Sequence, residues 1–143
     1  VLGPLAAARS LAGARVIACD VDETAVRGVA AALGRPAEGF VLDVRCPDSI
    51  RAVRDSVLAS AGRIDILVNN AAVDDKFESP ALAADRSRFE NYPLEMWRAM
   101  FEVNVTGIFL CSQSFGEVMV RAGRGSIVNI ASTYGIVAPD QSL

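Results

Sequence analysis

The stretch Asp-Ile-Leu-Val-Asn-Asn-Ala-Ala at residues 65–72 decides the fold of this chain. Its first half is a short, almost continuous apolar run, which is typical of a parallel strand covered on both faces. Two amides follow where the strand should end, and two small residues come after them. A turn favoured by Asn is one interpretation, but a turn does not require paired small residues afterwards. We therefore predict a buried strand whose end lets the backbone approach a flat ligand, with one amide able to fasten neighbouring strand ends.

Three other apolar runs share this character, and amphipathic patterns separate them. The predicted strands lie at residues 14–20, 39–44, 64–70 and 126–132. The apolar spacing of three and four residues predicts helices at 4–12, 23–33, 47–61 and 94–122. This alternation predicts an α/β fold with a doubly wound, parallel, Rossmann-like sheet, formed by one domain over residues 1–143.

Local signals suggest where two of these helices begin and end. Asp22 or Thr24 could cap the helix at 23–33, and Asp48 the helix at 47–61. Gly34 and Gly62 stand where these helices should stop. Residues 73–93, in contrast, are polar, charged and aperiodic, and we interpret them as a surface insertion.

The composition excludes several classes of function. The formal net charge of −3 and the lack of a basic run with aromatic residues argue against nucleic acid as a partner. The chain has no His, so imidazole can neither catalyse nor bind a metal here, and we expect no metal. Its three cysteines are isolated, which favours reduced thiols in a cytoplasmic protein. No apolar stretch is long enough to span a bilayer, and we expect no membrane partner.

Polar residues at the predicted strand ends are the candidates for ligand binding, because ligands of open α/β sheets bind beyond the carboxyl ends of the strands. Asp20 closes the first strand, 17 residues after Gly3. A carboxylate there can accept hydrogen bonds from ribose hydroxyls and repel a 2′-phosphate, which favours NAD over NADP. Helix capping is the structural alternative for Asp20. For Asp43, which could lie near an adenine amino group, a simple strand-to-helix turn is a serious alternative.

Three motifs together resemble the short-chain dehydrogenase/reductase family. Residues 65–72 are similar to its Asn-Asn-Ala-Gly motif, residues 97–107 to its Asn-x-x-Gly helix, and residues 125–132 to its strand that ends in the catalytic serine. They occur in the family's order at suitable separations, and the resemblance covers essentially the whole chain.

The resemblance implies roles for individual residues. Ser132 would hydrogen-bond the substrate's reacting oxygen, and the backbone of Asn104 would connect, through a water, a proton relay to a catalytic lysine. The structural alternatives are that Ser132 favours a turn and that Asn104 is a polar residue tolerated in a kinked helix. The implied NAD-binding residues are Gly3, Asp20, Val21, Asp43, Val44, Asn70, Ala71 and Ala72.

The chain also departs from the family pattern. Ala72 replaces the usual Gly, and the family's Tyr-x-x-x-Lys is missing: Tyr134 follows Ser132 by only two residues, and Ala138 stands where the lysine would be. The chain opens without Met and stops at Leu143. We therefore expect an internal fragment, incomplete at both ends and inactive by itself.

For the whole protein the resemblance implies hydride transfer between NAD(H) and a carbonyl or secondary alcohol of a small molecule. The alternatives are a non-catalytic NAD-binding sensor and a nucleotide-sugar epimerase or dehydratase. Residues 89–94 and 132–141 resemble a subgroup that acts in surface-sugar or flagellin modification, which hints at a sugar substrate. The apolar stripe within 94–122 could be core, or it could join subunits of a homodimer or homotetramer, as the corresponding helix often does in the family.

Overall fold

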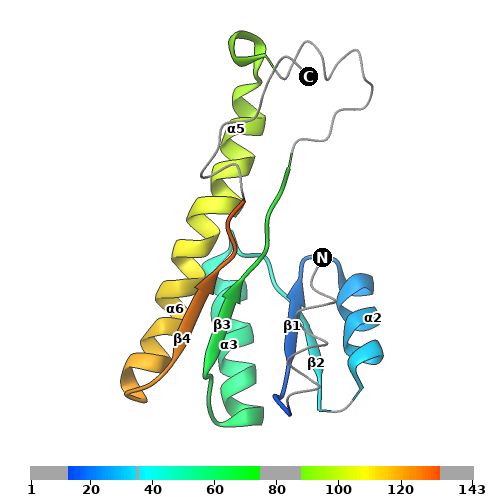
Figure 1. Ribbon diagram of the computed structural model, residues 1–143, viewed down its shortest axis with the longest axis vertical. Helices are drawn as coiled ribbons and strands as arrows, with labels where there is room; N and C mark the ends of the chain where they lie inside the picture. The colour runs from blue at the N-terminus through cyan, green and yellow to red at the C-terminus, as the bar shows by residue number, and fades with distance from the viewer. Residues whose placement is uncertain (1–12, 35, 75–87, 133–143) are drawn as a thin grey trace.

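Four short parallel strands and the helices between them carry the fold. The structure is a computed structural model, and it describes residues 13–34, 36–74 and 88–132 (Figure 1). Gly3, the predicted helix at 4–12, most of the insertion, and Tyr134 with Ala138 lie outside the described residues.

The strands confirm the predicted alternation, although each is shorter than its apolar run. They are β1 (Ile17–Asp20), β2 (Glu38–Val41), β3 (Ile66–Asn69) and β4 (Ser126–Asn129). β1 pairs in parallel with β2, and β3 pairs in parallel with β4. Within the described part of the chain these strands make two separate ladders, and no described strand joins β1 to β3. All four nevertheless run in the same direction, so their carboxyl ends share one side of the molecule (Figure 1).

Helices α2 (Glu23–Leu33) and α3 (Pro47–Ala61) have the predicted bounds. Asp22 caps α2, since its carboxylate accepts hydrogen bonds from the backbone N–H groups of Thr24 and Ala25. Gly34 and Gly62 end the two helices with positive φ angles of 68° and 72°, which an L side chain rarely adopts.

The predicted cap of α3 is wrong. Cys46, not Asp48, is the N-cap residue, and its side chain makes no capping bond. Pro47 takes the first helical position, where its missing N–H leaves no donor unsatisfied. Asp48 lies in the first turn, where its charge complements the helix dipole and pairs with Arg51.

The predicted helix at 94–122 is one helical path with a change of pitch. It contains α5 (Leu94–Phe101), the π-helical segment η2 (Glu102–Gly107) and α6 (Ile108–Arg121), and a short 3-10 helix, η1 (Phe89–Asn91), precedes it. π-Helical turns inside α-helices are frequent at functional sites. Among the described residues, no helix is long and apolar enough to cross a membrane.

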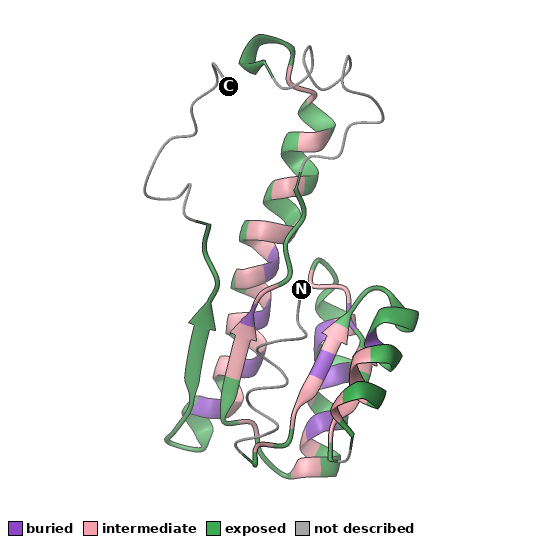
Figure 2. Cartoon of the chain, turned by 45° about the vertical axis from the view of Figure 1, so that its right-hand side comes forward, coloured by how far each residue is buried: buried purple, intermediate pink, exposed green. Residues whose placement is uncertain are grey.

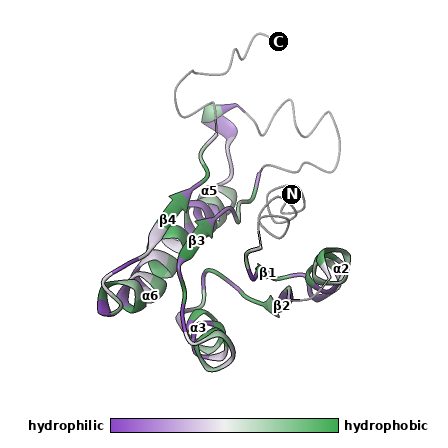
Figure 3. Cartoon of the chain, turned by 60° about the horizontal axis from the view of Figure 1, so that its bottom comes forward, coloured by the Kyte–Doolittle hydropathy of each residue, from purple (hydrophilic) through white to green (hydrophobic). Residues whose placement is uncertain are grey.

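The helices lie on both faces of the strands. On β2, Gly39 approaches Val26 of α2, while its neighbour Phe40 packs against the core formed with α3 and α6. Successive side chains of a strand point to opposite faces, so α2 lies on one face and α3 on the other (Figures 1 and 3). This is the doubly wound arrangement that the sequence predicted.

The buried core lies between α3, α6 and both pairs of strands, as the purple segments in Figure 2 indicate. Burial raises the pKa of Cys111 to about 11. Burial, with smaller contributions from Cys111 and Asp20, raises the pKa of Cys19 to about 12. Both thiols therefore stay protonated at neutral pH and pack as small apolar groups. The buried members of the core are Leu42, Ile50, Val53, Val57, Cys111 and Phe115.

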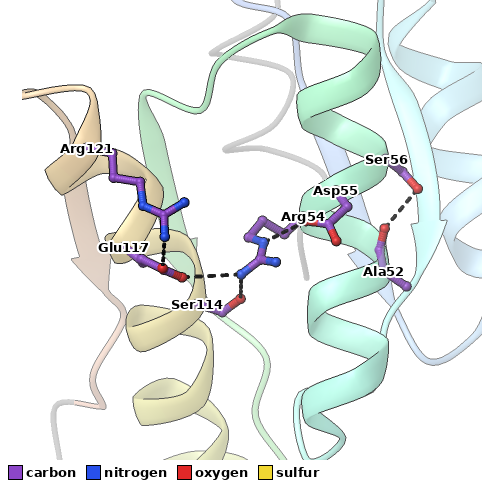
Figure 4. A network of polar contacts seen from close by, with 7 residues as sticks. All are labelled: Ala52, Arg54, Asp55, Ser56, Ser114, Glu117 and Arg121. Carbon is purple, nitrogen blue, oxygen red and sulfur yellow. Dashed lines mark hydrogen bonds and ion pairs between the residues drawn. The ribbon is translucent and has the colours of Figure 1, made fainter.

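A polar network connects the outer surfaces of α3 and α6 (Figure 4). The Arg54 guanidinium donates to Ser114 Oγ over 3.3 Å and lies 3.5 Å from Glu117 Oε2. Glu117 also pairs with Arg121. The Arg54 side chain is only 17% exposed, so this network seals the edge of the apolar contact between the two helices.

Candidate functional site

The carboxyl ends of β1 and β2 place two acids next to each other. Asp20 is the last residue of β1, and Asp43 follows the end of β2 by two residues. The Leu42 backbone N–H donates to the Asp20 carbonyl over 2.9 Å, which aligns the two strand ends. This is the edge of an open α/β sheet at which ligands bind.

The structure separates the two possible roles of Asp20. Asp22, not Asp20, caps α2. Within the described residues, the Asp20 side chain accepts one hydrogen bond, from Asp22 N to Oδ1 over 3.1 Å. Asp20 is exposed, and so is its neighbour Val21. One carboxylate oxygen of Asp20 is therefore available to a ligand.

Asp43, in contrast, is held by Arg45. Arg45 donates from its backbone N and its Nε to Oδ1 and from Nη2 to Oδ2, over 2.8–2.9 Å. These hydrogen bonds, the side-chain ones first, lower the pKa of Asp43, and Asp43 in turn raises the pKa of Arg45. Arg45 was not among the residues predicted from the sequence. Its position two residues after the acid was the available signal, but spacing alone does not show where a long side chain turns.

The loop after β2 packs directly onto η2. A Cβ at Gly107 would lie 2.7 Å from Val44 Cγ2, closer than carbon atoms approach without displacement. Gly107 is buried. The last residue of the Asn-x-x-Gly motif thus fixes the position of Val44 against the helix that carries Asn104.

The first amide of the Asn-Asn pair fastens two strands, as predicted. Asn69 is 8% exposed. Its Nδ2 donates to Asn129 Oδ1 of β4 over 2.8 Å and to Ser112 Oγ of α6 over 3.1 Å. Neither Asn129 nor Ser112 was predicted from the sequence as a site residue. The Asn69 amide therefore aligns the ends of β3 and β4. Asn70 follows the end of β3, and Ser132 follows the end of β4.

Asn104 connects η2 to the segment that follows β3. The Val73 N–H donates to Asn104 Oδ1, and Asn104 Nδ2 donates to the Val73 carbonyl, each over 2.9 Å. The side-chain amide thus pairs with one residue's backbone as a neighbouring strand would. Ala71 and Ala72, both exposed, therefore lie between Asn69 and Val73, and hydrogen bonds hold both of these residues.

Ser132 lies three residues after β4 and is exposed. The Ile130 N–H donates to the Asn69 carbonyl over 3.0 Å, which carries the β3–β4 pairing one step past β4. Asn70 and Ser132 therefore follow neighbouring strand ends. The described residues contain no cluster of three or more His, Cys, Asp or Glu side chains that could hold a metal ion.

Comparison with known proteins identifies relatives of this arrangement. The family model described as short chain dehydrogenase matches residues 4–142. A D-threitol dehydrogenase from Mycolicibacterium smegmatis is 39% identical over 96% of this chain and 50% of its own length. A 3-alpha-(or 20-beta)-hydroxysteroid dehydrogenase from Mycobacterium tuberculosis is 34% identical over 87% of this chain and 44% of its own length.

The fold has a similar relative among solved structures. The serine dehydrogenase of Escherichia coli superimposes with a TM-score of 0.80 at 28% identity, over 94% of this chain and 58% of that one. The chain thus spans about half the length of the curated relatives that it matches. None of these three names refers to surface sugars or flagellin, so the predicted sugar subgroup has no support from them.

The paired bonds between Asn104 and Val73 lead to a prediction for amide exchange. Asn104→Ala removes both bonds, and we expect the Val73 N–H to exchange with solvent roughly tenfold faster, as the loss of one net hydrogen bond implies. Asn104→Asp keeps an acceptor for that N–H, so its protection should be largely retained. Hydrogen exchange followed by NMR measures both. Equal exchange of Val73 in Asn104→Ala and the unmodified protein would contradict this role.

Proposed function

The chain belongs to the short-chain dehydrogenase/reductase family, and from this premise we propose that the whole protein is an NAD-dependent oxidoreductase. It would transfer a hydride between NAD(H) and a carbonyl or secondary-alcohol carbon of a small molecule. The observation that carries the proposal is the gathering of Asp20, Asp43, Asn70 and Ser132 at the carboxyl ends of the parallel strands. The 143 residues would supply most of the nucleotide-binding part of one domain.

The family implies a nicotinamide dinucleotide, and the residues present fit one. The available oxygen of Asp20 suits a ribose hydroxyl, and its charge would repel the 2′-phosphate of NADP, which supports NAD. Asp43 would face the adenine edge, beside Val44. Asn70 and Ala71 would lie beside the nicotinamide-side ribose. Gly3, Val21 and Ala72 complete the proposed contacts.

The chemistry follows from these roles. The nicotinamide, when bound, supplies or accepts the hydride. Ser132 would donate a hydrogen bond to the reacting oxygen of the substrate and so stabilise negative charge that develops there. The backbone of Asn104 would support a proton relay. Neither tyrosine of this chain is followed by Lys four residues later, so the acid–base pair of the family would come from outside these residues.

The relatives suggest a substrate class to test first. One is named for D-threitol, a small polyol, and another for a hydroxysteroid. We propose a secondary alcohol of the polyol type, because the more similar relative of the two carries that name. A sugar derivative remains part of this class.

Turnover by the whole protein tests the proposal. NAD reduction should be seen with a member of a panel of polyols, hydroxysteroids and sugar alcohols. We expect Ser132→Ala to lower kcat/KM by roughly 100-fold, the effect typical of removing one oxyanion donor. Ser126→Ala, at the opposite end of β4, is the matched control and should leave turnover unchanged. NAD binding without turnover of any alcohol would favour the sensor alternative.

Cofactor choice gives a second prediction. Asp20→Ala should reduce kcat/KM for NAD by roughly tenfold or more and leave NADP use unchanged or improved, because a favourable contact and a repulsion are both removed. Asp22→Ala is the matched control. It removes the cap of α2, which costs about 1 kcal/mol of stability, but should not change the ratio of NAD to NADP use. An equal fall for both cofactors in Asp20→Ala would refute the role of Asp20.

An exposed apolar stripe supports the proposed homo-oligomer. It runs along the helical path of α5, η2 and α6, opposite the side that buries Cys111 and Phe115. Trp97 and Phe101 stack within it, with ring centroids 4.5 Å apart. Its members are 44–60% exposed: Leu94, Trp97, Phe101, Val105 and Phe109. Such a stripe is typical of a surface that another chain covers, here a second copy in a homodimer or homotetramer.

A charge in the stripe should separate the subunits. We expect Phe109→Asp to shift the whole protein from an oligomer to a monomer in light scattering, because a carboxylate would be buried without a partner. Glu117→Asp, on the α3 side of α6, is a conservative control that should keep the oligomer. An unmodified protein that is already monomeric would rule out this interface.

A further inference from the structure

Arg45 has no role in the proposed function, yet it occupies most of the hydrogen-bonding capacity of Asp43. This inference rests on the proposed function. We infer that Arg45 is a positioning residue that fixes the Asp43 carboxylate as a single hydrogen-bond acceptor. The fixed acceptor would select a dinucleotide with a 6-amino purine over one with a 6-oxo purine.

The hydrogen bonds define how many acceptor sites remain. An ionised carboxylate offers about four lone-pair positions, two on each oxygen. Oδ1 of Asp43 accepts from both Arg45 N and Arg45 Nε, each over 2.9 Å. Oδ2 accepts from Arg45 Nη2 over 2.8 Å. One acceptor position is left, and it lies on Oδ2.

The carboxylate cannot easily turn away from this arrangement. Two parallel bonds from a planar guanidinium fix both its position and its plane. The backbone is held as well, since Asp43 N–H donates to Ser49 Oγ over 3.1 Å and the Asp43 carbonyl accepts from Cys46 N–H over 3.0 Å. The Asp43 side chain still keeps 33% exposure, so a ligand can reach part of the carboxylate.

Such a site distinguishes purines by the group at position 6. The 6-amino group of adenine donates a hydrogen bond and complements an acceptor. The 6-oxo group of hypoxanthine is itself an acceptor, so its lone pairs would face those of Oδ2. With Arg45 in place, the carboxylate cannot rotate to relieve this repulsion, and repulsion is an effective means of rejecting a wrong ligand.

A purely structural role predicts something different. Arg45 could serve only to hold the turn between β2 and α3, and its loss would then lower stability and weaken both dinucleotides equally. The ratio of two dissociation constants therefore separates the alternatives.

The experiment measures Kd of the whole protein for NAD and for nicotinamide hypoxanthine dinucleotide by isothermal titration calorimetry. We expect the unmodified protein to prefer NAD by roughly tenfold, about one net hydrogen bond. Arg45→Met should bring the ratio to within about twofold, since a free carboxylate can turn away. Arg45→Lys keeps the charge without the two-point contact, and it should also lose most of the preference.

Arg51→Met is the matched control, because Arg51 pairs with Asp48 on α3 and, among the described residues, forms no ion pair with Asp43; its ratio should equal that of the unmodified protein. An unchanged preference in both Arg45 variants, or no preference in the unmodified protein, would overturn the inference while leaving NAD binding intact. Failure of the unmodified protein to bind NAD at all would overturn the proposed function itself. Thermal unfolding of each variant confirms that it is folded.

Discussion

The apolar contact between α3 and α6 is the constraint on which the described structure depends. Each pair of strands is joined internally by backbone hydrogen bonds, but the two ladders do not join each other within the described residues. Ile50, Val53 and Val57 of α3 meet Cys111 and Phe115 of α6 beneath both pairs. Full burial of one such side chain contributes about 1.5–3 kcal/mol. Within the described residues, side-chain packing between α3 and α6 therefore connects the two halves of the candidate site.

Two side-chain amides fix the relative positions of elements that the apolar core brings together. Asn69 joins β3, β4 and α6, and Asn104 joins η2 to the segment after β3. An amide carries both donors and an acceptor, so it can satisfy partners of either kind. This explains why Asn occurs at these positions, where neither an apolar residue nor a carboxylate would complete both contacts. The two amides fix the loop of small residues that the proposed function assigns to the cofactor.

The two acids at the β1–β2 edge differ in their hydrogen bonding, and under the proposed function this difference would suit different parts of a dinucleotide. Asp20 keeps an oxygen open to a ligand, whereas Asp43 is held by Arg45 with one acceptor position left. An open carboxylate can adapt to the two hydroxyls of a ribose. A fixed carboxylate can select a base. Under the proposed function, the same residue type would adapt to the ligand at one strand end and select it at the next, depending on its neighbours.

The sequence by itself determined the α/β alternation, the bounds of α2 and α3, and the polar residues at the strand ends, because apolar period, glycine and strand-end chemistry act over a few residues. It did not reveal that Cys46 precedes α3 as its cap residue, that the long helix changes pitch at Glu102, or that Arg45 turns back onto Asp43. Only the tertiary structure decided that Asn104 pairs with Val73, 31 residues away, and Asn69 with Asn129, 60 residues away. Contacts over such separations exist only once packing has brought their elements together, and no local pattern encodes that.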